Sequence, residues 1–455
     1  MNIKAAYMVP HPPMIIPEVG RGSEKQIIDT IESYEEIAKE IAKINPETII
    51  ISSPHTLIYN DYFYLSTGDT IEGSLSMFGA SNISYKEEID TELVDEIERL
   101  ASLEEFPAGR TNETALDHAS IVPLYFIRKY LPKCKIVIVG FSGLSLIANY
   151  RMGMIIKEAI NNLNRNVVYV ASGDLSHKLQ EDGPYGFIEE GPIYDQRIMD
   201  VCFNKRFNEL LEFKESFLEK ASECGHRSFT IMAGVLDSLD LESKFYSHED
   251  VTGVGYGIIS FKPIGENKER NYYDKYLERE KLRVLSIDEY VKLAKKTIFE
   301  YIKNQNTIEV PDDISKKLLE EKHGVFVSIH KFDKLRGCIG TILPVTDNVA
   351  TEIIRNAIAA ATQDPRFNKI SEDELEYLEI NVDILTKPED IESKDLLDPK
   401  KYGVIVMSGY KSGLLLPDLE GIDDIDTQIS IAKQKGNISD NEEIKLQRFE
   451  VIRHK

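Results

Sequence analysis

Short, continuous apolar runs alternate with amphipathic segments over the first 260 or so residues of the chain. The runs predict buried strands at residues 3–9 (IKAAYMV), 47–53 (ETIIISS), 135–141 (KIVIVGF), 166–172 (NVVYVAS) and 255–261 (GYGIISF). Between them, apolar positions recur with helical period over residues 23–44, 90–105 and 149–164. Continuous apolar strands separated by amphipathic helices are typical of a mainly parallel or mixed sheet with helices on both faces. The N-terminal part is therefore predicted to be α/β.

The pattern is more mixed toward the C-terminus. Residues 323–342 read as a β-hairpin, residues 348–363 as a helix, and residues 377–390 and 402–417 as further strands. This part is predicted to be a smaller α+β domain.

A charged stretch with few aliphatic residues separates the two patterns. A chain of 455 residues is long enough for two or three domains. We place an N-terminal domain at residues 1–264, a charged linker at 265–284 and a C-terminal domain at 285–455.

Composition narrows the classes of partner. The formal net charge is −23, which argues against binding to nucleic acid or to an anionic membrane surface. No apolar stretch approaches the roughly 20 residues that a membrane span needs, and the N-terminus lacks a signal-peptide pattern, so a cytoplasmic location is expected. The four cysteines are scattered without a CxxC pair, which indicates reduced thiols rather than a disulfide framework. The oligomeric state is left open.

Three of the nine histidines follow predicted strands directly. His11 and His55 each come after a strand and a proline, and His177 follows the strand at 166–172. Ligands of open α/β sheets bind outside the carboxyl ends of the strands. We therefore expect these imidazoles to share one site, with His118 as a fourth candidate at the start of another apolar segment.

Two imidazoles and one carboxylate form the facial triad that binds Fe(II) in non-haem oxygenases. His11 and His55 would supply the imidazoles, and the third ligand would come from the segment SECGH as Glu223 or Cys224. Adjacent side chains generally point in different directions, so only one of the two is expected to face the metal. Zinc or another divalent metal accepts the same ligand types.

Five motifs, VPHPP, SSPHT, LDHASIVPLYF, SGDLSH and ECGHRSF, occur in that order. They resemble the LigB-type class III extradiol dioxygenases and the related Memo proteins. The resemblance implies ferrous iron at His11 and His55, His177 as acid/base, and His118 lining the substrate pocket. The third ligand is a glutamate in the dioxygenases and a cysteine in the Memo branch. Which of Glu223 and Cys224 faces the metal therefore decides between the two kinds of site.

The implied roles are chemically reasonable. A catechol loses protons when it chelates iron, and a histidine can accept and return one. Asp174, three residues before His177, is a candidate to orient that imidazole.

In the C-terminal part, KLRGCIGTI, TQDPRF, INVDILTKPED and SGLLLP resemble the AMMECR family. Here Arg336 and Cys338 are candidates for a reactive site, because a guanidinium next to a thiol favours the thiolate. The competing interpretation is a buried cysteine, with Arg336 paired to an acid such as Asp364.

The two resemblances together are similar to the AmmeMemoRadiSam set, whose third member is a radical-SAM protein. This chain has no CxxxCxxC motif, so a separate radical-SAM partner would have to supply iron–sulfur chemistry. Two functions stay open: an Fe(II)-dependent extradiol oxidoreductase acting on a catechol-like aromatic, or a Memo-type metal- or ligand-binding protein that works with that partner.

Overall fold

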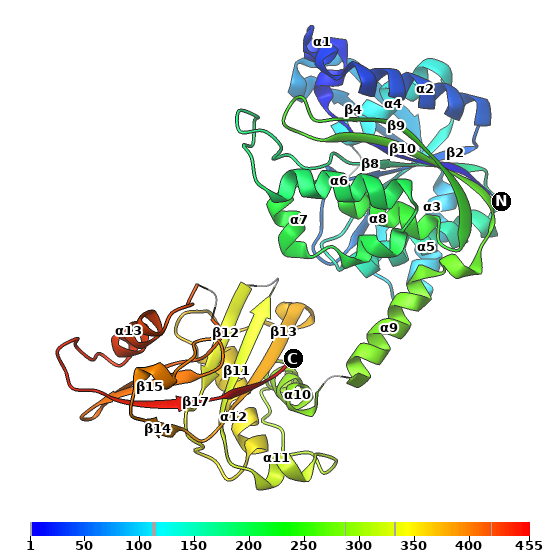
Figure 1. Cartoon of the computed structure of the whole chain (residues 1–455). Helices are drawn as coiled ribbons and strands as arrows, with labels where there is room; N and C mark the ends of the chain where they lie inside the picture. Colours follow the sequence, from blue (N-terminus) through cyan, green and yellow to red (C-terminus); the bar gives the residue numbers. More distant parts are fainter. Residues whose placement is uncertain (1, 112–114, 287, 332–333, 420) are drawn as a thin grey trace. The chain divides into compact units, whose positions relative to one another are not determined.

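The computed structural model describes residues 2–111, 115–286, 288–331, 334–419 and 421–455. The chain forms two compact units, Met1–Glu280 and Lys281–Lys455, which are coloured blue to green and green to red in Figure 1. In the described ranges, no helix combines the length and apolar character that a membrane span requires.

An eight-stranded sheet in the order β6-β3-β7-β2-β8-β1-β10-β9 forms the centre of the first unit. Its strands are β1 (Ile3–Val9), β2 (Thr48–Ser53), β3 (Phe63–Leu65), β6 (Ala108–Arg110), β7 (Lys135–Gly140), β8 (Val167–Ser172), β9 (Leu239–Glu249) and β10 (Tyr256–Glu266). Strands β7, β2, β8 and β1 are parallel to their neighbours in that order, whereas β10 pairs antiparallel with both β1 and β9. The sheet is therefore mixed, as the apolar runs predict.

Helices cover the sheet on both sides. They are α1 (Pro17–Gly20), α2 (Ile28–Ile44), α3 (Thr91–Leu103), α4 (His118–Tyr130), α5 (Leu146–Asn162), α6 (Glu190–Phe203), α7 (Glu215–Ala221) and α8 (His226–Val235). Helix α2 packs against α4 on one side, and α5 packs against α8 on the other (Figure 1). Strands β2 and β8 are buried along their whole length because they are covered on both faces.

A hairpin absent from the sequence prediction lies beside the main sheet. It consists of β4 (Thr70–Leu75) and β5 (Ala80–Glu88), joined by a 3-10 turn at Ser76–Phe78. Its strands alternate weakly between apolar and polar residues, which explains why the hydrophobic pattern does not reveal it.

The stretch predicted as a charged linker has regular structure. It contains the end of β10, a 3-10 turn at Lys268–Arg270 and most of α9 (Tyr272–Ser286). The Tyr272 N–H donates to the Asp237 carboxylate at 2.9 Å, which anchors the start of α9 on the first unit.

The second unit contains two four-stranded sheets, β12-β11-β13-β18 and β14-β17-β15-β16. The strands are β11 (Gly324–Lys331), β12 (Lys334–Gly340), β13 (Leu378–Leu385), β14 (Glu389–Ile391), β15 (Gly403–Ser408), β16 (Lys411–Leu415), β17 (Lys445–Phe449) and β18 (Val451–His454). The helices are α10 (Glu289–Asn304), α11 (Lys316–Glu320), α12 (Val349–Thr362) and α13 (Ile425–Lys435). All pairings in these sheets are antiparallel, and α10 and α12 pack against the first sheet. The α+β prediction is confirmed.

Candidate metal centre

Three histidines follow the carboxyl ends of three neighbouring parallel strands of the main sheet. His11 follows β1, His55 follows β2 and His177 follows β8, and these strands lie next to one another in the order β2-β8-β1. The Nε2 atoms of His11 and His55 are 3.1 Å apart. His177 is near enough to act electrostatically on both imidazoles.

His11 is the buried centre of the cluster, with 1% of its surface exposed. Its Nδ1 lies 3.0 Å from the Ser172 hydroxyl, and that hydroxyl donates its proton to the Ala119 carbonyl at 2.7 Å. Because the single serine proton is already used, Nδ1 must carry the hydrogen and donate it to Ser172. This tautomer leaves the Nε2 lone pair of His11 free for a ligand.

Cys224, rather than Glu223, is directed at the His11 imidazole. The Cys224 Sγ lies 3.5 Å from His11 Nε2. The Glu223 carboxylate instead accepts the N–H of His226 at 2.5 Å, where α8 begins. Glu223 thus satisfies a free N–H group at the helix N-terminus, a position that favours a carboxylate.

Asp174 also joins the cluster, in a place that differs from the sequence expectation. Its Oδ1 accepts the backbone N–H of His11 at 2.7 Å, and its Oδ2 lies 3.9 Å from His11 Nε2. Asp174 therefore holds the segment that carries His11 instead of orienting His177. His11, Asp174 and Cys224 together offer three ligand atoms within 4.8 Å of one another. The sequence does not reveal Asp174 as a possible ligand, because an aspartate in SGDLS also suits a turn.

Two glycines allow the Cys224 segment to approach the end of β8. A Cβ atom built on Gly173 would lie 2.2 Å from the Gly225 Cα, and one on Gly225 would lie 2.5 Å from the Phe229 ring. Backbone contacts then fix the thiol, since the Asp174 N–H donates to Cys224 Sγ at 3.3 Å. Close packing therefore requires a glycine at position 225, directly after Cys224.

His118 is the first residue of α4 and stacks on His55. The ring centroids are 4.3 Å apart with an interplanar angle of 26°. Asp117 caps this helix by accepting the Ser120 N–H, and it also accepts the Ser53 hydroxyl, both at 2.8 Å. Ser53 ends β2, so Asp117 ties the end of the His55 strand to the helix that carries His118. One ring nitrogen each of His11, His55 and His118 lie within 4.8 Å of one another.

Aromatic side chains flank the outer histidines. Phe78, at the tip of the β4–β5 hairpin, meets His118 edge to face at 5.2 Å, and Tyr185 stacks on His177 at 5.2 Å. In the described part of the chain, the Nε2 atom of His177 is buried without a hydrogen-bond partner. A buried unpaired nitrogen is costly, and it identifies His177 as a group able to receive a hydrogen bond or a proton from a bound molecule.

Burial keeps the imidazoles neutral. It lowers the pKa of His118 and of His177 to about 4, with a further contribution from His55, and it holds the pKa of His11 well below its usual value. Burial together with the carboxylates of Asp174 and Glu223 raises the pKa of the Cys224 thiol. Neutral imidazoles are the form that binds a metal, and a cation at this place would offset the desolvation that disfavours the thiolate.

Two donor separations match those around one metal ion, and His11 is shared by two groups of donor atoms, His11–His55–His118 and His11–Asp174–Cys224. Two imidazole nitrogens on a tetrahedral ion lie about 3.3 Å apart, and a nitrogen and a thiolate sulfur about 3.5 Å apart, when ordinary zinc bond lengths are used. The corresponding separations here are 3.1 Å between the His11 and His55 nitrogens, and 3.5 Å between His11 Nε2 and Cys224 Sγ.

The two candidate residues of the second unit are not paired with each other. Arg336 donates to the Glu374 carboxylate at 3.0 and 2.8 Å, and also to the carbonyl of Asn368 at 2.7 Å. Arg336 is thus paired with an acid, as the competing interpretation predicts, but the acid is Glu374 and not Asp364, which accepts from Arg366 at 2.7 Å. Arg336 thus ties β12 to the 3-10 turn that carries Glu374.

Cys338 has its own set of contacts. Its Sγ accepts the hydroxyl of Ser328 at 3.2 Å from the facing position on β11, and its N–H donates to Asp364 at 2.9 Å. The thiol is half-buried. These contacts do not test whether the Cys338 thiol is reactive, so that role stays a prediction.

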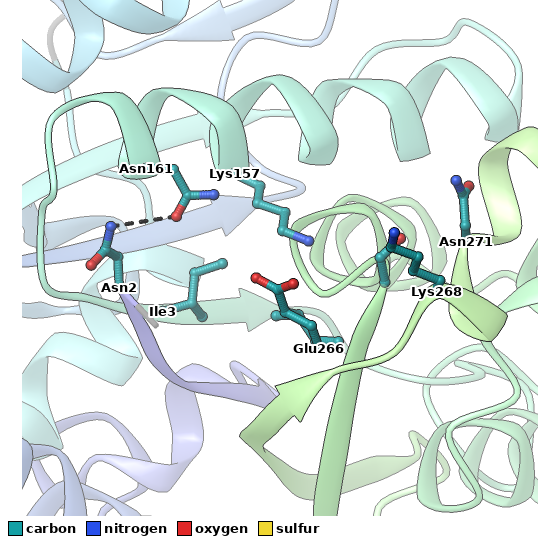
Figure 2. Close-up of a pocket in the computed structure, with 9 residues that line it drawn as sticks. Asn2, Ile3, Lys157, Asn161, Glu266, Lys268 and Asn271 are labelled. Atoms are coloured by element: carbon teal, nitrogen blue, oxygen red, sulfur yellow. Dashed lines mark hydrogen bonds between the residues drawn. The ribbon is translucent and has the colours of Figure 1, made fainter.

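A cavity of about 600 Å³ lies near the start of β1, at the opposite end of this strand from His11. Figure 2 shows the hydrogen bond that the Asn2 side chain donates to the Asn161 side chain, and it shows Lys157 and Glu266 pointing into the cavity. Because β1 starts at Ile3 and His11 follows its other end, this cavity is separate from the histidine cluster.

Comparison with known proteins gives two family matches. The profile described as the catalytic LigB subunit of aromatic ring-opening dioxygenase matches residues 5–259, and the AMMECR1 profile matches residues 291–454. A protein of Clostridium acetobutylicum is 42% identical over 471 residues, covering both chains completely. A Thermotoga maritima protein is 48% identical over 168 residues, which are 36% of this chain and 97% of that one. A crystal structure of an uncharacterized Pyrococcus horikoshii protein covers 36% of this chain and 88% of its own, at 32% identity and a TM-score of 0.34.

Proposed function

The chain belongs to the LigB family of ring-opening dioxygenase catalytic subunits and carries a C-terminal AMMECR1 domain, and from this we propose that its N-terminal unit is a metal-dependent, oxidoreductase-like protein. His11 would hold one transition-metal ion, with His55 and Cys224, one from each of the two donor groups that share His11, as its further ligands. The observation that carries the proposal is the convergence of the Cys224 Sγ and the His55 Nε2 on His11 Nε2, at 3.5 and 3.1 Å.

The bound ion would supply Lewis-acid or one-electron chemistry, according to its identity. The protein's own groups supply the rest. Ser172 fixes the tautomer of His11. His177 exchanges a proton with a bound molecule through its unpaired Nε2, and His118 lines the pocket next to His55.

A Memo-type, non-dioxygenase role is the version that the geometry favours. A thiolate makes the ligand set softer than the two-histidine, one-carboxylate triad of non-haem iron oxygenases. Iron, zinc and copper all accept two imidazoles and a thiolate. In this version His11, His55 and Cys224 would hold an ion that supplies ligand binding or electron transfer.

The second candidate function is Fe(II)-dependent extradiol cleavage of a catechol-like aromatic, which the family membership supports. In this version the carboxylate of the triad comes from Asp174, whose Oδ2 lies 3.9 Å from His11 Nε2, because Glu223 is engaged at the start of α8. His177 accepts a hydroxyl proton from the substrate.

Metal analysis of anaerobically purified protein tests the centre. We expect about one metal ion per chain, a loss of that metal in His11→Ala and Cys224→Ser, and full retention in Glu223→Gln. Normal metal content in His11→Ala would refute the centre, whereas loss in Glu223→Gln but not in Cys224→Ser would reverse the ligand assignment.

The two versions differ in oxygen chemistry. The iron-loaded protein should consume oxygen with at least one member of a catechol panel if it is a ring-opening enzyme. Loss of this activity in Asp174→Asn, with Cys224→Ser still active, would favour the dioxygenase. Absence of oxygen uptake with a metal-replete protein would favour the Memo-type role.

A radical-SAM partner belongs to the same proposal, because the AMMECR1 domain and a LigB-family domain are joined in one chain. Affinity purification of the tagged full-length protein from its native cells should enrich a protein with a CxxxCxxC motif. Its absence from repeated anaerobic preparations would remove the partner from the proposal.

A further inference from the structure

Three loops that carry or contact the histidines each present a pair of large apolar side chains to solvent. They are the loop after β2, the tip of the β4–β5 hairpin and the loop after β8. The six side chains are between 38% and 93% exposed, and we call them the apolar rim: Leu57, Ile58, Met77, Phe78, Tyr185 and Phe187. Single exposed apolar residues are ordinary, but pairs on three loops around one site indicate a binding surface.

Contacts connect the apolar rim to the histidine cluster. Phe78 meets His118 edge to face, and Tyr185 stacks on His177, each with ring centroids 5.2 Å apart. The pair on the loop after β2 follows His55 by two and three residues. Each of the three loops therefore places its apolar side chains next to one of the outer histidines.

Both the histidines and the aromatic rings of the rim are accessible to a ligand. His55 is exposed, and His118 and His177 are half-buried. The side chains of Phe78 and Tyr185 are 38% and 60% exposed, so each ring can contact a bound molecule as well as its histidine. Aromatic side chains bind a flat ring by offset stacking or by edge-to-face contact.

The rim has more apolar surface than one bound ring covers. Phe78 and Tyr185 contact the histidines, but Met77 is almost fully exposed, and Phe187 and the pair after His55 are about half exposed. Removing such surface from water is favourable. An apolar substituent on the bound ring would cover it.

The charges of the same loops disfavour an anionic substituent. Outside the metal centre, residues 54–62, 76–79 and 173–189 contain one lysine, Lys178, and four carboxylates, at positions 61, 181, 182 and 189. Arg21 adds a cation beside the hairpin, 3.3 Å from where a Cβ atom on Gly79 would lie. Carboxylates still outnumber cations, so the loops repel a ring that bears a carboxylate and accept an uncharged one.

From the accessible aromatic rings, the apolar pairs and the acidic loops, we propose that the histidine cluster binds an uncharged aromatic ring that carries an apolar substituent. The ring lies next to the histidines, with Phe78 and Tyr185 as its aromatic neighbours, and the substituent covers the rest of the rim. This inference rests on the proposed function, because it names the class of molecule that the proposed metal centre takes.

Phenols test the rim without testing the metal, because one hydroxyl cannot chelate an ion. We expect NMR titration of the full-length protein to give about tenfold tighter binding for 4-butylphenol than for phenol, and weaker binding for 4-hydroxybenzoate than for phenol. Equal affinity for phenol and 4-butylphenol would overturn the proposal, as would preferential binding of 4-hydroxybenzoate.

Truncation of the rim locates the binding. The double variants Met77→Ala/Phe78→Ala and Tyr185→Ala/Phe187→Ala should each lose most of the preference for 4-butylphenol. Ile264 is 49% exposed and lies on β10 beyond the pairing of Phe261 with Ala6, toward the start of β1. Ile264→Ala is therefore the matched control and should bind as the wild type does. An unchanged preference in either double variant, or an equal loss in the control, would refute the assignment, and circular dichroism confirms that each variant is folded.

Catechols then separate this inference from the metal centre. Anaerobic titration with catechol and 4-butylcatechol should give tighter binding to the metal-loaded protein than to chelator-treated protein, with the butyl preference present in both. Binding that does not depend on metal, with the butyl preference intact, would refute the metal centre and leave the rim standing. Metal-dependent binding with equal affinity for the two catechols would refute the rim alone.

Discussion

The Nε2 atoms of His55 and His11 lie 3.1 Å apart, although 44 residues separate them in the chain. The parallel pairing of β2 and β1 with β8 brings them together, because each histidine follows the carboxyl end of its strand. Pro10 and Pro54 precede the two histidines and restrict the backbone before each one. The two histidines are therefore positioned by the fold, which would lower the entropic cost of binding an ion between them.

The hydroxyl of Ser172 should tune the metal affinity without touching the ion. In Ser172→Ala, the Nδ1–H of His11 loses its acceptor, and the tautomer with a free Nε2 is no longer favoured. We expect metal affinity to fall about 10- to 100-fold, measured by competition with a chromophoric chelator. Ser33→Ala, at a buried serine of α2, is the control. Unchanged affinity in the Ser172 variant would contradict the tautomer assignment.

Gly225 should be intolerant of a side chain. An alanine Cβ there would lie 2.5 Å from the Phe229 ring and 2.9 Å from the Gly173 Cα. We expect Gly225→Ala to reduce the free energy of unfolding by about 1–3 kcal/mol, and to lower metal content by displacing Cys224. At Gly265, an added Cβ meets no atom within 4 Å, so Gly265→Ala should leave both measurements unchanged. A metal-replete and fully stable Gly225 variant would refute this account of the CG pair.

His177 should affect turnover but not metal binding. Burial lowers its pKa to about 4, so the imidazole is neutral near pH 7 and can accept a proton. If the protein consumes oxygen with a catechol, we expect His177→Gln to retain its metal and to lose about 10²- to 10⁴-fold in rate. Metal loss in this variant would instead make His177 a ligand, and wild-type turnover would remove it from the mechanism.

The ion pair between Arg336 and Glu374 should make the second unit sensitive to acid. Burial acts to raise the pKa of Glu374, but the hydrogen bonds from Arg336, Ser371 and Lys331 outweigh it and lower this pKa from 4.5 to about 2. A folded-state pKa below the ordinary value means that the stabilisation is complete above about pH 4.5 and is lost as the pH falls toward 2.

The matching experiment is urea unfolding of Arg336→Gln at several pH values. We expect a loss of about 1–3 kcal/mol at pH 7 that shrinks as the pH falls from 4.5 toward 2. Arg355 lies 3.8 Å from Glu352 and its side chain is 56% exposed, so Arg355→Gln should change stability much less. A difference between wild type and Arg336→Gln that stays constant with pH would contradict the assignment.

Much of the fold follows from local pattern. The apolar runs predicted β1, β2, β7, β8 and β10, and the helical periods predicted α2, α3 and α5. Burial on both faces produces long apolar strands, and these are visible without any tertiary information. The β4–β5 hairpin was missed because its strands are short of apolar residues.

The order of apolar runs and histidines along the chain is enough to predict that His11, His55 and His177 lie near one another, because parallel strands place their carboxyl ends along the same side of a sheet. Tertiary packing is needed to show that Cys224 faces His11 and that Glu223 turns to the start of α8. The side chains of Glu223 and Cys224 point in different directions. Which of them faces His11 depends on the close approach of Gly173 and Gly225, which lie about 50 residues apart in the chain. The same holds for Arg336 and Asp174, whose partners are set by long-range packing and not by neighbours in sequence.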